Sequence, residues 1–295
     1  MKLAVNYSTP AAHLVRSGVM QTDLFKCPAW PDLLPTVQAV LPAYIHFPLK
    51  VGAGKGEALD FETQQPADWR KVETLLAQTA TPFINLHLSP TVQEHPGVAL
   101  NELHPDQIEK VTACLLCDVE AIVRRFGADR VIVENDYDET TGLPQAACLP
   151  QVIAQVVQTT GCGFLLDLSH ARLAAQRLTM PIQTYMAGLP VTQIREIHIT
   201  GIQRFAGKYI DLLRRGGIDE QTIAAMAGRL TDHLPMTAAD WTFFEWSIAE
   251  IQSGRWGIPT IIAFEYGGVG RGWAELTETA ILEEQTPRLY KMIKG

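Results

Sequence analysis

Short apolar runs alternate with longer amphipathic segments from one end of the chain to the other. The runs are rich in leucine or β-branched residues and almost continuously apolar, which is typical of strands buried on both faces of a parallel sheet. The clear runs are Leu3–Tyr7, Ala43–Pro48, Phe83–Leu88, Arg130–Asn135, Phe164–Ser169, Glu196–Thr200 and Thr260–Tyr266. One further run, Thr231–Met236, is a poorer strand because Pro235 cannot donate a hydrogen bond to a neighbouring strand. It falls where a strand is expected, and we count it as the eighth.

The segments between the runs carry recognisable helix boundaries. Pro105 stands at the start of the helix predicted over Pro105–Phe126, and Gly127 ends it. Thr237 and Asp240 are spaced as a capping box for the helix predicted over Ala238–Ser253. Strands that alternate with helices imply parallel strands joined by right-handed crossovers.

Eight strand–helix units predict an α/β fold, and specifically a single (β/α)8 TIM barrel that takes up residues 1–295 as one domain. An open doubly wound sheet is the alternative, but the first strand is not followed by the glycine fingerprint usual in that fold. The N-terminus turns polar too soon for a signal peptide, and no apolar stretch approaches the ~20 residues that cross a bilayer. We therefore expect a cytoplasmic protein.

Histidines and carboxylates stand at the carboxyl ends of the apolar runs, and these ends converge on the active-site face of a barrel. Imidazole and carboxylate groups suit zinc, manganese and iron. A single histidine or carboxylate at a strand end is usually structural, for example a helix cap. Five of the eight histidines fall at such ends, however, which favours a metal site. The candidate ligands are His46, His87, Glu134, Asp167, His170, His198, Asp232, His233 and Glu265.

Nine candidates are too many for one ion and suffice for two or three divalent metal ions. Glu134 and Glu265 are the natural bridging carboxylates, and we expect both to be catalytic. Asp232 and His233 are less secure, because adjacent residues of a strand point to opposite faces. We expect a break at Pro235 to turn both side chains inward.

Two glycine-rich stretches, Val51–Glu57 and Gly267–Trp273, lack the spacing of a P-loop. The second lies where barrels often bind phosphate, so that Arg271 could hold an anion. Lys50 and Asn135 also follow or end ligand-bearing runs. We expect Asn135, Arg271 and Lys50 to contact substrate.

The order His, His, Glu, Asp-x-x-His, His, Asp/His, Glu on successive strands resembles the xylose-isomerase-like TIM barrels. The stretch GCGFLLDLSHARLAA, with IHITG and DHLPM downstream, is similar to the multinuclear non-heme iron-dependent oxidases, which modify cysteines in peptides. This resemblance implies two or three irons, a peptide or small thiol-containing substrate, and dioxygen as oxidant. Zinc and manganese remain possible metals.

Three other functions remain open. A sugar isomerase or epimerase would need only Glu134, Asp167, His198 and Glu265 around one or two metals. An endonuclease IV-like phosphoester hydrolase is disfavoured by the net charge of −8 and by adjacent Asp232 and His233 in place of Asp-x-His. A binding protein with a relict metal site is the non-enzyme alternative. Partners could include a protein that delivers a peptide, or a second copy of the chain, but no nucleic acid or membrane is favoured.

Overall fold

The structure is a computed structural model that describes residues 1–295, except for the side chain of Glu139. The chain divides into two compact units, each of which is described by itself. Unit 1 comprises residues 1–44, 198–253 and 260–295, and unit 2 comprises residues 45–197 and 254–259. Organisation as one domain over residues 1–295 remains a prediction.

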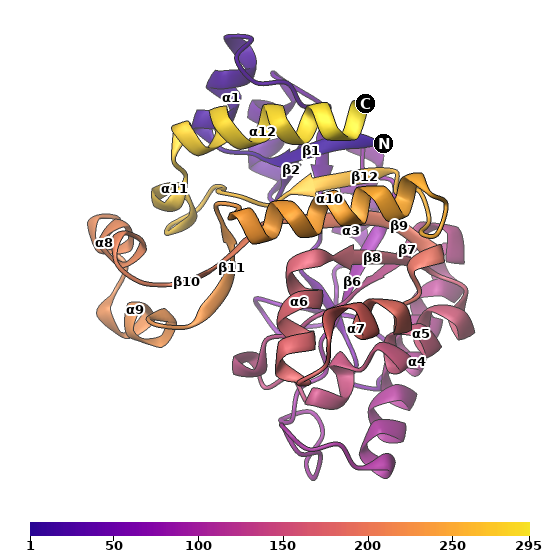
Figure 1. The fold of residues 1–295 in the computed structure, drawn as a ribbon. Helices are drawn as coiled ribbons and strands as arrows, with labels where there is room; N and C mark the ends of the chain where they lie inside the picture. The colour runs from indigo at the N-terminus through magenta and orange to yellow at the C-terminus, as the bar shows by residue number, and fades with distance from the viewer. The chain divides into compact units, whose positions relative to one another are not determined.

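Unit 2 is built on parallel strands in the order β8–β7–β6–β4, of which Figure 1 labels β6, β7 and β8. β5 pairs antiparallel with β4. The register pairs Lys50 with His87 and His87 with Glu134, so three polar residues lie side by side across neighbouring strands. The strands are β4 (Leu49–Val51), β5 (Leu59–Asp60), β6 (Ile84–Leu88), β7 (Val131–Glu134) and β8 (Gly163–Asp167).

The helices of unit 2 bury one apolar stripe each. In α4 (Pro105–Phe126), Val111, Leu115, Val119 and Ile122 recur at helical spacing and are buried. The proline at its start and Gly127 at its end confirm the predicted boundaries. The other helices are α3 (Trp69–Gln78), α5 (Pro150–Thr160), α6 (Leu168–Arg177) and α7 (Ile182–Gly188).

Unit 1 contains the parallel strands β2 (Leu24–Cys27), β1 (Lys2–Asn6) and β12 (Ile261–Phe264), with β1 in the centre. The boundaries between the units fall within β3 (Ala43–Ile45) and β9 (Ile194–Ile199). The helices are α1 (Thr9–Arg16), α2 (Leu34–Gln38), α8 (Lys208–Arg215), α9 (Glu220–Met226), α10 (Ala238–Gln252), α11 (Trp273–Leu276) and α12 (Thr279–Lys294). The capping box predicted at Thr237 and Asp240 is present at the start of α10.

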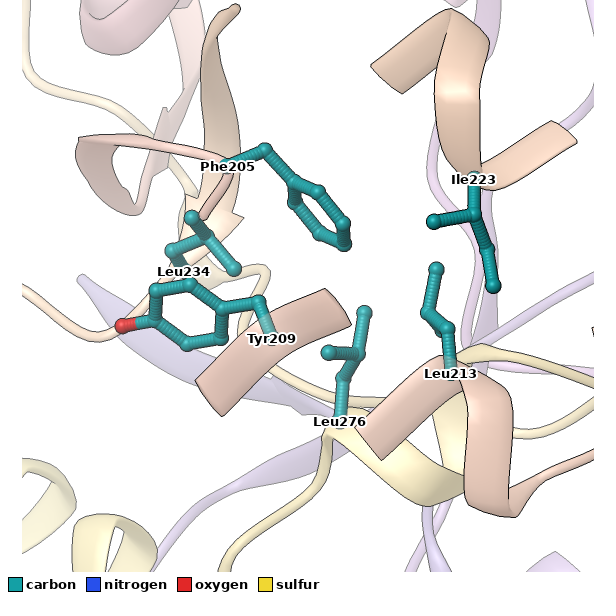
Figure 2. Close-up of a cluster of buried hydrophobic side chains, with 6 residues drawn as sticks. All are labelled: Phe205, Tyr209, Leu213, Ile223, Leu234 and Leu276. Carbon is teal, nitrogen blue, oxygen red and sulfur yellow. The ribbon is translucent and has the colours of Figure 1, made fainter. Parts of the chain in front are cut away.

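An antiparallel ribbon, β10 (Gly201–Arg204) with β11 (Leu230–Leu234), carries α8 and α9 between its strands (Figure 1). The ribbon and these helices enclose a small apolar cluster, shown in Figure 2. The cluster consists of Phe205, Tyr209, Leu213, Ile223, Leu234 and Leu276. This segment therefore shares a small hydrophobic core with α11, which contributes Leu276.

The clear apolar runs are confirmed as β1, β3, β6, β7, β8, β9 and β12. The prediction that Thr231–Met236 adds a parallel barrel strand is wrong, because β11 pairs antiparallel with β10. β10 follows β9 after a single residue, whereas a parallel strand requires a long crossover. The run LFKC of β2 escaped prediction because it is short and contains a lysine. Over the part of the chain that the structure describes, no helix is long and apolar enough to cross a membrane.

Candidate metal centre

Glu134 ends β7 and is 1% exposed, and its carboxylate faces histidines on two sides. Oε2 lies 3.5 Å from Nε2 of His46 and 3.2 Å from Nε2 of His87. Oε1 lies 3.8 Å from Nδ1 of His170. The two Nε2 atoms of His46 and His87 are themselves 3.3 Å apart. One carboxylate oxygen and two imidazole nitrogens therefore converge on one point.

Glu134 also belongs to a second group of donors. Glu134, Asp167 and His170 each offer a ligand atom, and these atoms lie within 4.8 Å of one another. Nε2 of His170 lies 3.7 Å from Oδ2 of Asp167. Oε2 of Glu134 thus faces His46 and His87, and Oε1 faces His170, so that this carboxylate could contribute to holding more than one metal ion.

Backbone carbonyls orient two of these imidazoles. Nδ1 of His87 donates to the carbonyl of Leu49 at 3.0 Å, and Nδ1 of His170 donates to the carbonyl of Asn135 at 2.8 Å. Because a carbonyl only accepts, each Nδ1 carries a proton, and in the neutral form of each ring the lone pair is on Nε2. Histidines that bind metals are oriented by the same kind of contact. The donor set of unit 2 therefore fits divalent metal ions.

The Asp-x-x-His pair combines a structural role with a potential ligand role. Asp167 is the N-cap of α6, and its Oδ1 accepts a hydrogen bond from the backbone N–H of His170 at 2.7 Å. Oδ2 is the oxygen that faces the His170 ring. Capping uses one carboxylate oxygen and directs the other toward the imidazole, so the two roles do not compete.

Two buried asparagines support this group. Oδ1 of Asn85 accepts a hydrogen bond from the N–H of Phe47 at 2.8 Å, and its Nδ2 donates to the carbonyl of Phe47 at 2.9 Å. The same Nδ2 lies 3.1 Å from Nε2 of His46. Sequence reasoning missed Asn85, although its place two residues before His87 in a strand puts both on one face. Asn135 bonds the backbone N–H and carbonyl of Asp167 at 2.9 and 3.0 Å. Its contact with substrate remains a prediction.

A second donor group lies in unit 1, around Glu265 directly after β12. Nδ1 of His198 is 3.1 Å from Oε1 of Glu265, and the ammonium of Lys26 forms an ion pair with the same oxygen. All three residues are buried. Lys26 was missed because the strand that carries it, β2, was missed.

The adjacent residues Asp232 and His233 bring their side chains together, with 3.6 Å between Oδ2 of Asp232 and Nε2 of His233. The expected break at Pro235 is wrong in position, because the break lies at His233 itself, whose φ is +58°. A non-glycine residue rarely adopts this conformation, and it is held here by Thr200 and Glu265. Oγ1 of Thr200 accepts from the His233 N–H at 2.9 Å, and Nδ1 of His233 lies 3.0 Å from the Glu265 carbonyl.

Aromatic rings pack against three of the predicted ligands. Phe61 contacts His87, Tyr137 contacts His170, and Trp273 contacts His233, with ring centroids 5.3, 5.0 and 5.1 Å apart. Each ring limits the orientations open to its imidazole and covers part of it from water. All three histidines also direct Nδ1 at a backbone carbonyl.

The remaining predicted substrate residues lie in ordinary structural contacts. Lys50 is buried and forms an ion pair of 2.9 Å with Glu94. Burial raises the pKa of Glu94, but the hydrogen bond and charge of Lys50, together with hydrogen bonds from Thr91, outweigh it, so the pKa lies below its ordinary value. Arg271 is exposed and donates to the carbonyl of Gly217. Substrate contacts of Lys50 and Arg271 remain predictions.

The first glycine-rich stretch, Val51–Glu57, binds a carboxylate of the protein itself, that of Asp118. Three backbone N–H groups, those of Gly52, Gly54 and Gly56, donate to the buried carboxylate of Asp118 at 2.8, 3.0 and 2.7 Å. The φ angles of these glycines are +123°, +73° and +72°, which other residues adopt only under strain. The loop thus joins β4 to α4 through Asp118.

Comparison with known proteins supports the fold. The chain is similar to a xylose isomerase domain containing protein of Salmonella typhimurium LT2, with a TM-score of 0.52 and 12% identity over 100% of this chain and 97% of that chain. This likeness confirms the predicted α/β fold of the xylose-isomerase-like TIM-barrel class.

Curated relatives match parts of the chain. A UPF0276 protein of Paraburkholderia phytofirmans is 31% identical over 36% of this chain and 35% of its own length. A UPF0276 protein of Caulobacter vibrioides is 23% identical over 57% of this chain and 58% of its own length. The chain thus spans between about a third and three fifths of the length of these relatives.

A family model described as "RiPP precursor modification enzyme MbnB/TglH/ChrH" matches residues 36–234, which is more than half of the chain. RiPPs are ribosomally made peptides that are modified after translation. This match confirms the predicted resemblance to enzymes that modify peptides. The chain belongs to the MbnB/TglH/ChrH family of RiPP precursor modification enzymes.

Proposed function

We propose that the chain is a multinuclear iron-dependent oxidase that modifies a cysteine of a peptide. Family membership supports a peptide substrate, and the histidine and carboxylate donors support iron among the metals that such ligands bind. The observation that carries the proposal is Glu134, whose two oxygens face different donor groups. A carboxylate in this position can hold two metals a few ångströms apart.

All nine predicted ligands belong to this proposal as ligands of two or three iron ions. Unit 2 contributes His46, His87, Glu134, Asp167 and His170, and unit 1 contributes His198, Asp232, His233 and Glu265. Bound iron(II) would supply a Lewis acid for a substrate thiolate and the electrons that activate dioxygen. Glu134 and Glu265 are the proposed catalytic carboxylates.

The residues around the donors would keep the imidazoles in the form that binds metal. The carbonyls of Leu49 and Asn135 hold the proton of each ring at Nδ1, and so leave Nε2 as the ligand atom. Phe61 and Tyr137 pack against the same two rings and limit access of water. A substrate sulfur would then compete with few solvent molecules for an open metal position.

The sugar isomerase alternative needs only Glu134, Asp167, His198 and Glu265. It gives no ligand role to His46 and His87, although their Nε2 atoms lie within 3.5 Å of the Glu134 carboxylate. The multinuclear oxidase uses these contacts, and we therefore prefer it.

The test begins with metal content, measured element by element on protein purified without oxygen and without a metal affinity column. We expect two or three irons per chain. The loaded protein, mixed with a cysteine-containing peptide and oxygen, should change the mass of the peptide at that cysteine. Glu134→Gln should abolish the change, whereas Glu283→Gln, at an exposed position of α12, should not. A chain that holds only zinc, or no metal after reconstitution, would contradict the proposal.

A further inference from the structure

The arginine at the end of α6 joins two loops of unit 2, the loop after β6 and the loop after β7. In the first loop, Nη2 of Arg177 donates to the carbonyl of Leu100 at 3.0 Å and to Oδ1 of Asn101 at 2.9 Å. In the second loop, Nη2 donates to the carbonyl of Leu143 at 2.8 Å, and Nη1 donates to the carbonyl of Tyr137 at 3.2 Å. One guanidinium therefore binds residues of both loops.

The same two loops also contact each other directly. The N–H of Val92 donates to the carbonyl of Gly142 at 2.9 Å, and the N–H of Gln145 donates to the carbonyl of Leu100 at 2.8 Å. The side chain of Gln145 returns to the helix and donates to the carbonyl of Arg177 at 2.9 Å. The planar, five-donor guanidinium suits such a junction, whereas a lysine has one donor atom. The two loops and the end of α6 thus form one hydrogen-bonded network.

Tyr137 connects this network to the donor group of Glu134, Asp167 and His170. Its carbonyl accepts from Arg177, and its ring packs against His170, with ring centroids 5.0 Å apart. His170 and Arg177 are seven residues apart in α6, so they lie on the same face of the helix, two turns from each other. One residue of the loop after β7 therefore contacts both positions of this helix face.

Contacts of two kinds orient the imidazole of His170. Nδ1 donates to the carbonyl of Asn135 at 2.8 Å, which fixes one atom of the ring. The ring of Tyr137 packs against the imidazole at an interplanar angle of 52°, which restricts rotation about that hydrogen bond. Loss of a partner that orients a metal ligand typically weakens metal binding about 10- to 100-fold. The placement of Tyr137 therefore matters to any metal that His170 holds.

We propose that Arg177 is a positioning residue of the metal centre, which holds Tyr137 against His170 and thereby sets the orientation of this ligand. The inference rests on the proposed function in one respect, that His170 binds metal. Arg177 acts through the backbone of Tyr137. Its effect on the metal should therefore disappear when the Tyr137 ring is absent.

The first measurement uses NMR of the histidine rings in the metal-free chain, with the His170 signal assigned by its loss in His170→Gln. The nearby ring of Tyr137 shifts this signal, and Tyr137→Ala removes the shift. Arg177→Met keeps a long side chain without donors, and should move the signal toward its position in Tyr137→Ala. Arg125→Met is the matched control, because Arg125 is an exposed arginine of α4 that pairs with Glu73 at 3.0 Å. It should leave the signal unchanged.

The second measurement is the chelator concentration that removes half of the iron(II) after anaerobic loading. Arg177→Met and Tyr137→Ala should each weaken iron retention about 10- to 100-fold. The double variant should be no weaker than the weaker single variant, because both changes remove the same contact. Tyr137→Phe keeps the ring and should match the natural chain, as should Arg125→Met.

The outcomes separate the inference from the proposed function. An unchanged His170 signal in Arg177→Met, or losses of iron retention that multiply in the double variant, would overturn the inference while the proposed function stands. A natural chain that binds no iron would contradict the proposed function, and the shifted signal would still support the placement of Tyr137 by Arg177. Circular dichroism checks that each variant folds. If Arg177→Met does not fold, Arg177→Lys carries both measurements and should give smaller changes in the same direction.

Discussion

Glu134 and Glu265 are two buried glutamates at the carboxyl ends of strands, and their neighbours give them different chemistry. Glu134 faces imidazoles of His46, His87 and His170, whereas Glu265 faces His198 and the ammonium of Lys26. The contacts given for the first are all imidazoles, whereas the second pairs with one imidazole and one ammonium. Equivalent places at strand ends therefore do not imply equivalent roles.

The largest effect is expected from Glu134→Gln. An amide cannot bridge two cations as a carboxylate does, so metal content should fall below two and activity should fall by more than the roughly 100-fold typical of outer-shell changes. Elemental analysis and peptide mass spectrometry measure both. Stability of the metal-free protein should change less than in Glu265→Gln, because the contacts of Glu134 given above are with imidazoles and not with an ammonium. Full metal content in this variant would show that the Glu134 carboxylate is not needed to bind the metal ions, and would contradict the difference proposed between Glu134 and Glu265.

Glu265→Gln, unlike Glu134→Gln, should clearly lower the stability of the metal-free protein. It breaks the buried ion pair between Glu265 and the ammonium of Lys26, which costs about 3–5 kcal/mol of unfolding free energy. Urea unfolding in the presence of a chelator measures this loss. Adding Lys26→Met to the variant should restore much of it, and equal stabilities of the single and double variants would argue against the ion pair.

Asp118→Ala tests a carboxylate whose partners are backbone groups. It removes the acceptor of three N–H groups in the loop of Gly52, Gly54 and Gly56, so unfolding free energy should fall by about 2–3 kcal/mol. Metal content should stay as in the natural chain, since Asp118 is not among the predicted ligands. A loss of metal in a folded variant would show that the loop supports the centre.

The smallest effect concerns the pair of Lys50 and Glu94. Because the pKa of Glu94 is lowered from 4.5 in the folded chain, its contribution to stability is present above pH 4.5 and is lost as the pH falls through the folded value. Glu94→Gln lacks this contribution. The stability difference between the two proteins, measured by urea unfolding with a chelator, should therefore shrink from pH 7 to pH 3. A constant difference would mean that Lys50 and Thr91 do not stabilise the ionised carboxylate.

The sequence by itself determined the strand and helix pattern and the residues from which a metal site can be built. Short, continuously apolar runs are typical of strands buried inside a sheet. Pro105 favours a helix start through its fixed φ and missing N–H, and Thr237 and Asp240 set one by local hydrogen bonding. The histidines and carboxylates at strand ends followed from the same pattern. These inferences depend on neighbours in sequence, which any reader of the chain can see.

The tertiary structure decided how each of these groups is used. The +58° φ of His233 depends on Thr200 and Glu265, and the glycine-rich loop is occupied by Asp118 from α4. Lys26 meets Glu265 only because β2 and β12 flank the same strand. Such contacts join residues far apart in the chain, so they cannot be predicted from the local sequence pattern. The charge at a buried site therefore depends on which side chains the fold brings together.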